Sequence, residues 1–231
     1  MTTNNYQEGH RERIREKFEK DFGKTMADYE LLEILLTAYL PRKDVKPLAK
    51  DLISKFGSIS AVVTAPLKEL TKVSGVGEVV ATNLRVVGAV SGRSAWQKLS
   101  DNNKTIISNW YDLIDYCTLT MAHSKIEIFK VVLLDSVGKV IAEEIVQTGT
   151  VDSVHVYVRE LTKIVLDTGA KSIVLVHNHP SGNPSPSDDD VNLTRSIISS
   201  LKGLDISVWD HLIICDGNYF SFKEKGMLSK F

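Results

Sequence analysis

The sequence has few cysteines and no long apolar run, and both shortages exclude classes of protein. Only Cys117 and Cys215 occur in 231 residues, and neither belongs to a Cys-x-x-Cys pair. A disulfide scaffold and a thiolate zinc site are therefore excluded, so a metal would have to use histidine and carboxylate. No window approaches the ~18 unbroken apolar residues of a transmembrane helix. The N-terminus has no apolar run behind its basic residues and so predicts no secretory signal, which makes cytoplasmic residence the expectation.

The small net charge is the sum of two unlike parts. The chain has 28 Lys or Arg and 29 Asp or Glu, a net charge of -1. Residues 1–100 hold 16 basic and 12 acidic side chains (+4), whereas the remainder holds 12 and 17 (-5). Common domains have ~100 to 150 residues. The length and the uneven charge together favour two domains with different partners.

The apolar pattern changes along the chain from helical to strand-like. Between residues 28 and 93 apolar residues recur at helical spacing, and Gly57 is placed to close one of the helices. From about Ile126 there are β-branched runs typical of strands, IEIFKVVLL, KVIAEEIV and KSIVLVHNH, separated by helical stretches. This alternation indicates an α/β or α+β domain. A polar stretch, 96–109, is the predicted linker, so we expect domains over residues 1–100 and 104–231.

The segment His177-Asn-His179-Pro-Ser-Gly-Asn-Pro-Ser-Pro-Ser187-Asp-Asp-Asp190 has the composition of a metal site. It follows the strand-like run 172–176, so the two histidines project to the same side, about 6.6 Å apart along the strand. Ser187 then opens a helix that would bring the Asp190 carboxylate back toward them. Two histidines, one aspartate and a water make a four-coordinate zinc site with an open position, which is typical of catalytic zinc.

The same residues also allow structural interpretations. Ser187 with Asp190 is a plausible variant of the helix capping box, and three aspartates in a first helical turn suit the helix dipole. A His-x-His at the end of a strand is often incidental. The conjunction favours a metal site, because polar residues at the mouth of a buried apolar strand are costly unless they have a role.

The sequence resembles the JAMM or MPN+ metalloprotease motif, which consists of His-x-His, seven further residues, a serine, two more residues and an aspartate. His177, His179, Ser187 and Asp190 fit this motif without a gap. The whole chain resembles RadC-type proteins of the bacterial UPF0758 family. The segments that carry this wider resemblance are HNHPSGNPSPS, Gly149-Thr150, Arg159-Glu160, Asp210-His211, Gly9-His10-Arg11, YELLEILL and PRKDVKPLAK.

The resemblance implies an MPN/JAMM fold of the cytidine-deaminase-like kind with one zinc ion on His177, His179 and Asp190. It also implies that a glutamate from an earlier strand polarises the bound water and that Ser187 donates a hydrogen bond to the oxyanion. Glu143 and Glu144 are adjacent candidates on opposite faces of a strand. The family's spacing, five positions before the glycine of Gly-Thr, selects Glu144. Asp210 would either orient His211 as a metal ligand through a hydrogen bond, or the two residues would form a purely structural hydrogen bond.

Residues 70–84, LTKVSGVGEVVATNL, resemble a helix-hairpin-helix. In such a motif glycines, here Gly75 and Gly77, let backbone N–H groups approach a DNA phosphate, and Lys72 and Arg85 would add positive charge. The alternative is that the two glycines only permit a tight turn between helices.

The sequence therefore predicts an all-α helix-hairpin-helix domain followed by an α/β metalloprotease domain. The leading hypothesis is a zinc metallopeptidase or isopeptidase that cleaves an unidentified protein or peptide. The alternative is a DNA-binding, repair-associated protein in which the JAMM fold is a scaffold. A zinc deaminase is excluded because the sequence has no Pro-Cys-x-x-Cys.

Overall fold

A computed structural model describes residues 3–100, 105–106, 108–149 and 158–231, and it divides the chain into two compact units, Met1–Val90 and Ser91–Phe231. The boundary lies inside helix α6 (Glu78–Leu99), before the predicted end of the first domain. The predicted linker, 96–109, is wrong in part. Trp96 and Leu99 still belong to α6, and they pack in the core of the second unit because both side chains are apolar.

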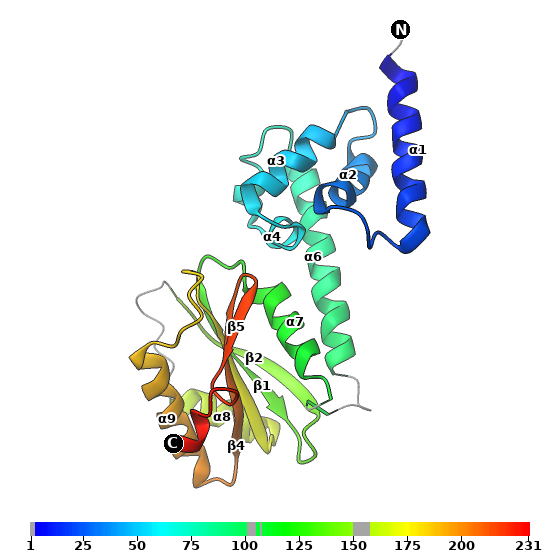
Figure 1. The fold of residues 1–231 in the computed structure, drawn as a ribbon. Helices are drawn as coiled ribbons and strands as arrows, with labels where there is room; N and C mark the ends of the chain where they lie inside the picture. Colours follow the sequence, from blue (N-terminus) through cyan, green and yellow to red (C-terminus); the bar gives the residue numbers. More distant parts are fainter. Residues whose placement is uncertain (1–2, 101–104, 107, 150–157) are drawn as a thin grey trace. The chain divides into compact units, whose positions relative to one another are not determined.

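The first unit is helical, as the apolar spacing predicted. Its elements are α1 (Thr3–Asp21), α2 (Asp28–Tyr39), α3 (Lys46–Phe56), α4 (Ile59–Thr64), α5 (Leu67–Leu70) and the first part of α6 (Figure 1). Leu32 and Leu36, one turn apart on α2, meet Leu52, Leu70 and Leu84 in a core without solvent exposure. Gly57 closes α3 with φ of 91°, a conformation that favours glycine, which confirms the predicted helix end.

A glycine on α6 fixes how closely this helix approaches α4. A Cβ atom at Gly88 would lie 2.5 Å from the carbonyl oxygen of Val63, which is backbone and cannot move aside. We expect Gly88→Ala to lower the stability of the first unit by about 1–3 kcal/mol, measured by urea unfolding followed with far-ultraviolet circular dichroism.

The control for Gly88→Ala is Gly92→Ala on the same helix, where the nearest atom, Thr120 Cγ2, lies 3.4 Å away. This change should be neutral or stabilise by up to about 1 kcal/mol, because alanine has the higher helix propensity. All three tryptophans lie after residue 90, so tryptophan fluorescence reports on the second unit. A Gly88→Ala variant as stable as wild type would show that α4 moves away at little cost.

The second unit is a five-stranded sheet flanked by helices. Its elements are α7 (Trp110–Met121), β1 (Glu127–Leu134), β2 (Val140–Gly149), α8 (Val158–Thr168), β3 (Ser172–Asn178), α9 (Asp188–Lys202), β4 (Ser207–Cys215), β5 (Asn218–Ser221) and a final 3-10 turn, Leu228–Lys230. The strand order is β2-β1-β3-β4-β5, and only β3 and β4 are parallel. None of the helices in the described ranges combines the length and apolar character needed to cross a membrane.

Strand β3 lies at the centre of the sheet and is buried on both faces. Val174 and Val176 belong to the core with α7, whereas Ile173 and Leu175 belong to the core with α8 and α9. Figure 1 shows α7 on one side of the sheet and α8 and α9 on the other. This alternation places His177, two residues after Leu175, on the face of α8 and α9. The helical region followed by an α/β sheet domain confirms the predicted fold class at this level.

Candidate metal centre

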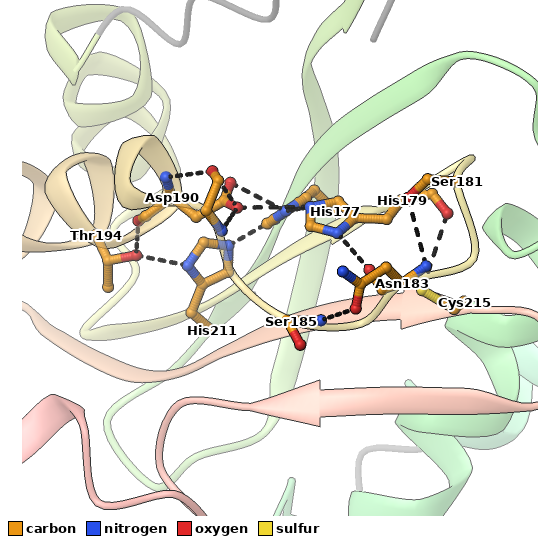
Figure 2. Close-up of polar contacts among 10 residues, drawn as sticks. His177, His179, Ser181, Asn183, Ser185, Asp190, Thr194, His211 and Cys215 are labelled. Atoms are coloured by element: carbon orange, nitrogen blue, oxygen red, sulfur yellow. Dashed lines mark hydrogen bonds and ion pairs between the residues drawn. The ribbon is translucent and has the colours of Figure 1, made fainter.

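The end of β3 and the start of α9 bring His177, His179 and Asp190 together. His177 has no exposed surface, and its Nε2 lies 3.0 Å from Nε2 of His179 and 3.2 Å from Oδ1 of Asp190. Nε2 of His179 lies 3.5 Å from Oδ2 of Asp190. Figure 2 shows the two rings and the carboxylate facing one another. The predicted grouping of these three side chains is therefore present.

The spacing of the three ligand atoms fits a small divalent cation. Zinc–ligand bonds of ~2.0–2.1 Å in tetrahedral geometry place ligand atoms about 3.3 Å apart, and the three separations here are 3.0, 3.2 and 3.5 Å. Two imidazole nitrogens and one carboxylate oxygen are also a donor set that binds zinc. Of the residues that the structure describes, these three form the one group of histidine, cysteine or carboxylate side chains with this closeness.

Ser187 and Asp190 form the capping box at the start of α9 that the sequence analysis described as plausible. The Ser187 hydroxyl accepts a hydrogen bond from the backbone N–H of Asp190 at 3.1 Å and lies 2.7 Å from Oδ2 of Asp190 as a donor. The backbone N–H of Ser187 donates to the same oxygen at 2.7 Å. This capping box belongs to the site as well, because it orients the Asp190 carboxylate toward the two histidines.

The charges of the site influence one another. Burial alone would raise the pKa of Asp190, but the adjacent imidazoles of His177 and His179 outweigh burial and hold this pKa below its ordinary range. The hydrogen bond with Asp190 raises the pKa of His179. Burial lowers the pKa of His211 well below its ordinary value. Asp190 is therefore ionised and available as a ligand at any physiological pH.

The prediction of Glu144 as the general base is not supported by its position. Glu144 is exposed on β2, the outermost strand, and it pairs with Val131, which in turn pairs with Leu175 on β3. Two strand spacings and two residues along the strand place its Cα about 12 Å from that of His177. Glu143 points to the opposite face, where it accepts hydrogen bonds from Tyr116 and Lys130. Neither carboxylate reaches the metal centre.

Another carboxylate, Glu127, is electrostatically coupled to the three clustered side chains, and the sequence interpretation did not consider it. It begins β1, on the same face as Phe129, whose ring stacks on His177 at 5.8 Å. Burial raises the pKa of Glu127, and the charges of His177, Asp190 and His179 also act on it. The alternation Glu127, Phe129, Val131 was available from the sequence, but the pairing of β1 with β3 was not.

Asp210 and His211 have separate roles. The Asp210 carboxylate accepts hydrogen bonds from the Ser221 hydroxyl and from the backbone N–H groups of Lys223 and His211, so it holds β4 and β5 together. His211 is not one of the three clustered ligands, because its Nε2 faces Nδ1 of His177 at 2.8 Å. The suggestion of a carboxylate that orients a ligand histidine is therefore wrong for this pair.

The glycine turn of the first unit lies between α5, a single helical turn, and α6, which begins at Glu78 as predicted. Gly75 has φ of 91°, so the turn requires glycine there for conformational reasons. Lys72 forms an ion pair with Glu69 at 2.7 Å. These contacts explain the turn structurally and leave DNA binding a prediction.

The sheet with a His-His-Asp group at the end of its central strand defines a JAB-type domain. Residues 107–227 match the RadC-like JAB domain family, and residues 7–82 match the UPF0758 N-terminal family. A UPF0758 protein of Ruegeria pomeroyi is 44% identical over 223 residues, which cover 96% of this chain and 99% of that protein. The chain therefore belongs to the UPF0758 family. Thr150 of the Gly149-Thr150 pair lies outside the described residues.

Proposed function

We propose that the chain is a zinc-dependent metallopeptidase or isopeptidase that hydrolyses an amide bond. The observation that supports this most directly is the convergence of Nε2 of His177, Nε2 of His179 and the Asp190 carboxylate at separations of 3.0–3.5 Å. When bound, zinc lowers the pKa of a water ligand to about 7 and polarises a carbonyl group. The side chains of His179 and Asp190 are 16% and 12% exposed, so this side of the centre is in contact with solvent, whereas His177 is not.

Glu127 is the proposed general base. A carboxylate next to the centre can take the proton of the attacking water and pass it to the leaving amine. Its raised pKa brings its proton affinity closer to that required for both transfers. This assignment replaces Glu144, which lies on β2, the edge strand that β1 separates from β3.

Ser187 is the proposed oxyanion donor. Its hydroxyl now donates to Oδ2 of Asp190 at 2.7 Å, so the hydroxyl would have to rotate toward the substrate carbonyl as charge develops there. Removal of a comparable donor costs ~10²–10³ in rate. The backbone N–H of Ser187 still bonds to Asp190, so rotation leaves the carboxylate anchored.

The function is tested by comparing protein and peptide termini in cells that express wild-type protein or the His177→Ala variant, which lacks one of the three proposed zinc ligands. New termini, or free lysine side chains in the case of an isopeptidase, should appear only with the wild type. Purified wild-type protein should then cleave peptides that span these sites. The proposal fails if zinc-loaded wild-type protein gives the same termini as the variant.

As the pH falls, zinc binding should begin to weaken at a higher pH than it would with a ligand histidine of ordinary pKa. His179 must be neutral to ligate, and its pKa is raised above 6.5 by Asp190. In the metal-free protein the raised pKa of His179 stabilises the folded state fully below pH ~6.5. This contribution to the free energy of unfolding is lost as the pH rises through the raised pKa. Zinc titrations are followed by calorimetry between acidic and neutral pH, in buffers of different ionisation enthalpy. Zinc binding should still release a proton from His179 at pH values above the ordinary histidine pKa of 6.5. Proton release confined to lower pH would contradict the shift.

DNA contact through Lys72, Gly75 and Gly77 stays a prediction. Backbone phosphate binding at a helix start would be independent of base sequence and would weaken steeply with salt. Fluorescence anisotropy with duplex and branched DNA at two salt concentrations measures this, with Lys72→Gln expected to lower affinity. Salt-insensitive binding would contradict phosphate recognition.

A further inference from the structure

A series of hydrogen bonds connects α9 to the metal centre through two buried histidines. The Thr194 hydroxyl donates to the backbone carbonyl of Asp190 at 2.5 Å and lies 2.6 Å from Nδ1 of His211. Nε2 of His211 lies 2.8 Å from Nδ1 of His177. Figure 2 shows this series, and Thr194, His211 and His177 have no exposed surface. No solvent water therefore competes for these bonds.

The direction of every hydrogen bond in the series follows from the group at its start, the backbone carbonyl of Asp190. A backbone carbonyl accepts only, so the single hydrogen of the Thr194 hydroxyl is directed to Asp190. The Thr194 oxygen must then accept from His211, which places the proton of His211 on Nδ1. His211 lies between the rings of Phe129 and Phe222, 5.7 and 4.8 Å away, where a charged ring would be costly. A neutral His211 has a bare Nε2 that accepts.

The last bond determines the tautomer of His177. Because Nε2 of His211 accepts, Nδ1 of His177 carries the proton, and Nε2 of a neutral His177 keeps its lone pair. That lone pair is the one directed at His179 and Asp190. His179 reaches the same tautomer differently, because its Nδ1 donates to the carbonyl of Asn183 at 2.7 Å within its own loop.

We propose that Thr194 and His211 are positioning residues that hold His177 in the tautomer able to bind the metal. The backbone carbonyl of one ligand residue, Asp190, thereby sets the protonation pattern of another, His177, through two intervening side chains. If the series ran in the opposite direction, the proton of His177 would lie on Nε2 and would block the metal. This inference rests on the proposed metal site but not on peptidase activity.

The test compares Thr194→Val, which removes the hydroxyl at nearly constant shape, with Thr194→Ser, which keeps it. Zinc dissociation constants are measured by competition with a chromogenic chelator. Loss of a hydrogen bond behind a ligand histidine weakens metal binding by ~10–100-fold, which we expect for valine, whereas serine should bind zinc close to wild type. Melting of the metal-free proteins checks that both variants fold.

A second background shows whether Thr194 acts through His211. His211→Phe keeps a ring between Phe129 and Phe222 but removes both nitrogens. In that background Thr194→Val should weaken zinc binding no further, because effects transmitted through one partner are not additive. Nitrogen-15 NMR of zinc-loaded protein should show His177 protonated on Nδ1 in the wild type and in Thr194→Ser, with loss of this hydrogen-bonded proton in His211→Phe.

The outcomes separate this inference from the proposed function. If Thr194→Val binds zinc as wild type does, or if Thr194→Ser loses as much affinity as Thr194→Val, the positioning role is overturned while the peptidase proposal stands. If the wild type binds zinc without cleaving any amide bond, the peptidase proposal fails while the affinity series still decides the positioning role. A wild type that binds no zinc overturns both.

Discussion

Purified His177→Ala and Asp190→Ala proteins should contain no zinc, whereas wild-type protein should contain one ion per chain. Each variant removes one of three protein ligands, and the remaining two cannot hold zinc against a chelator. Plasma mass spectrometry of dialysed protein measures the metal content. Loss of zinc affinity also removes the stabilisation that the ion gives to the fold, so thermal melting with and without added zinc should differ for the wild type alone.

Two controls separate ligation from folding. His123→Ala removes a histidine of the same unit that lies 3.7 Å from Asp216 and outside the metal-binding group, so it should keep its zinc. Asp190→Asn retains an oxygen for the capping bond from the Ser187 backbone but lacks the charge, so it should fold and lose zinc. Stoichiometric zinc in both alanine variants would place the metal elsewhere.

The Glu127→Gln protein should keep its zinc and lose hydrolysis by about 10²–10⁴-fold, the usual contribution of a positioned acid–base group. The amide of glutamine keeps the size of the side chain but cannot accept the proton of the attacking water. Zinc content and the rate of cleavage of one peptide substrate are measured on the same samples. Loss of rate together with loss of metal would instead mean that Glu127 supports the ligands.

Glu144→Gln is the matched comparison, since it makes the same chemical change on the neighbouring strand. Its carboxylate is exposed on β2, so the variant should cleave as wild type does. The reverse result, an inactive Glu144→Gln and an active Glu127→Gln, would restore the base that the family spacing selected. Inactivity of both would point to a role for β2 in substrate binding.

Local patterns predicted much of what the structure contains. The helical spacing around Leu32 and Leu36, the Gly57 helix end and the strand before His177 depend on neighbours in sequence, and each is present. His177, His179 and Asp190 are separated by a strand end, a proline-containing loop and one helical turn. The chain between them is short, so their meeting could be predicted without knowledge of the tertiary fold.

Contacts between distant segments could not be predicted in this way. Glu127 lies on the strand that pairs with β3, two residues before the partner of His177, and the sequence does not state that pairing. His211 reaches His177 because β4 is parallel to β3, with Leu175 paired to His211. The continuation of α6 as one helix past the boundary of the two compact units also could not be predicted, because polar residues near its end have the composition of a linker.

The convergence of three metal-binding side chains also has a consequence for the life of the protein in a cell. A site that binds zinc only when folded adds a free energy of RT ln(1 + [Zn]/Kd) to the stability, about 2.7 kcal/mol at a hundredfold excess over Kd. His177 lies at the end of β3 and Asp190 in the first turn of α9, and an unfolded chain does not hold these side chains at ligand distance. The abundance of the chain should therefore follow the supply of free zinc, because starved molecules unfold more often and are degraded.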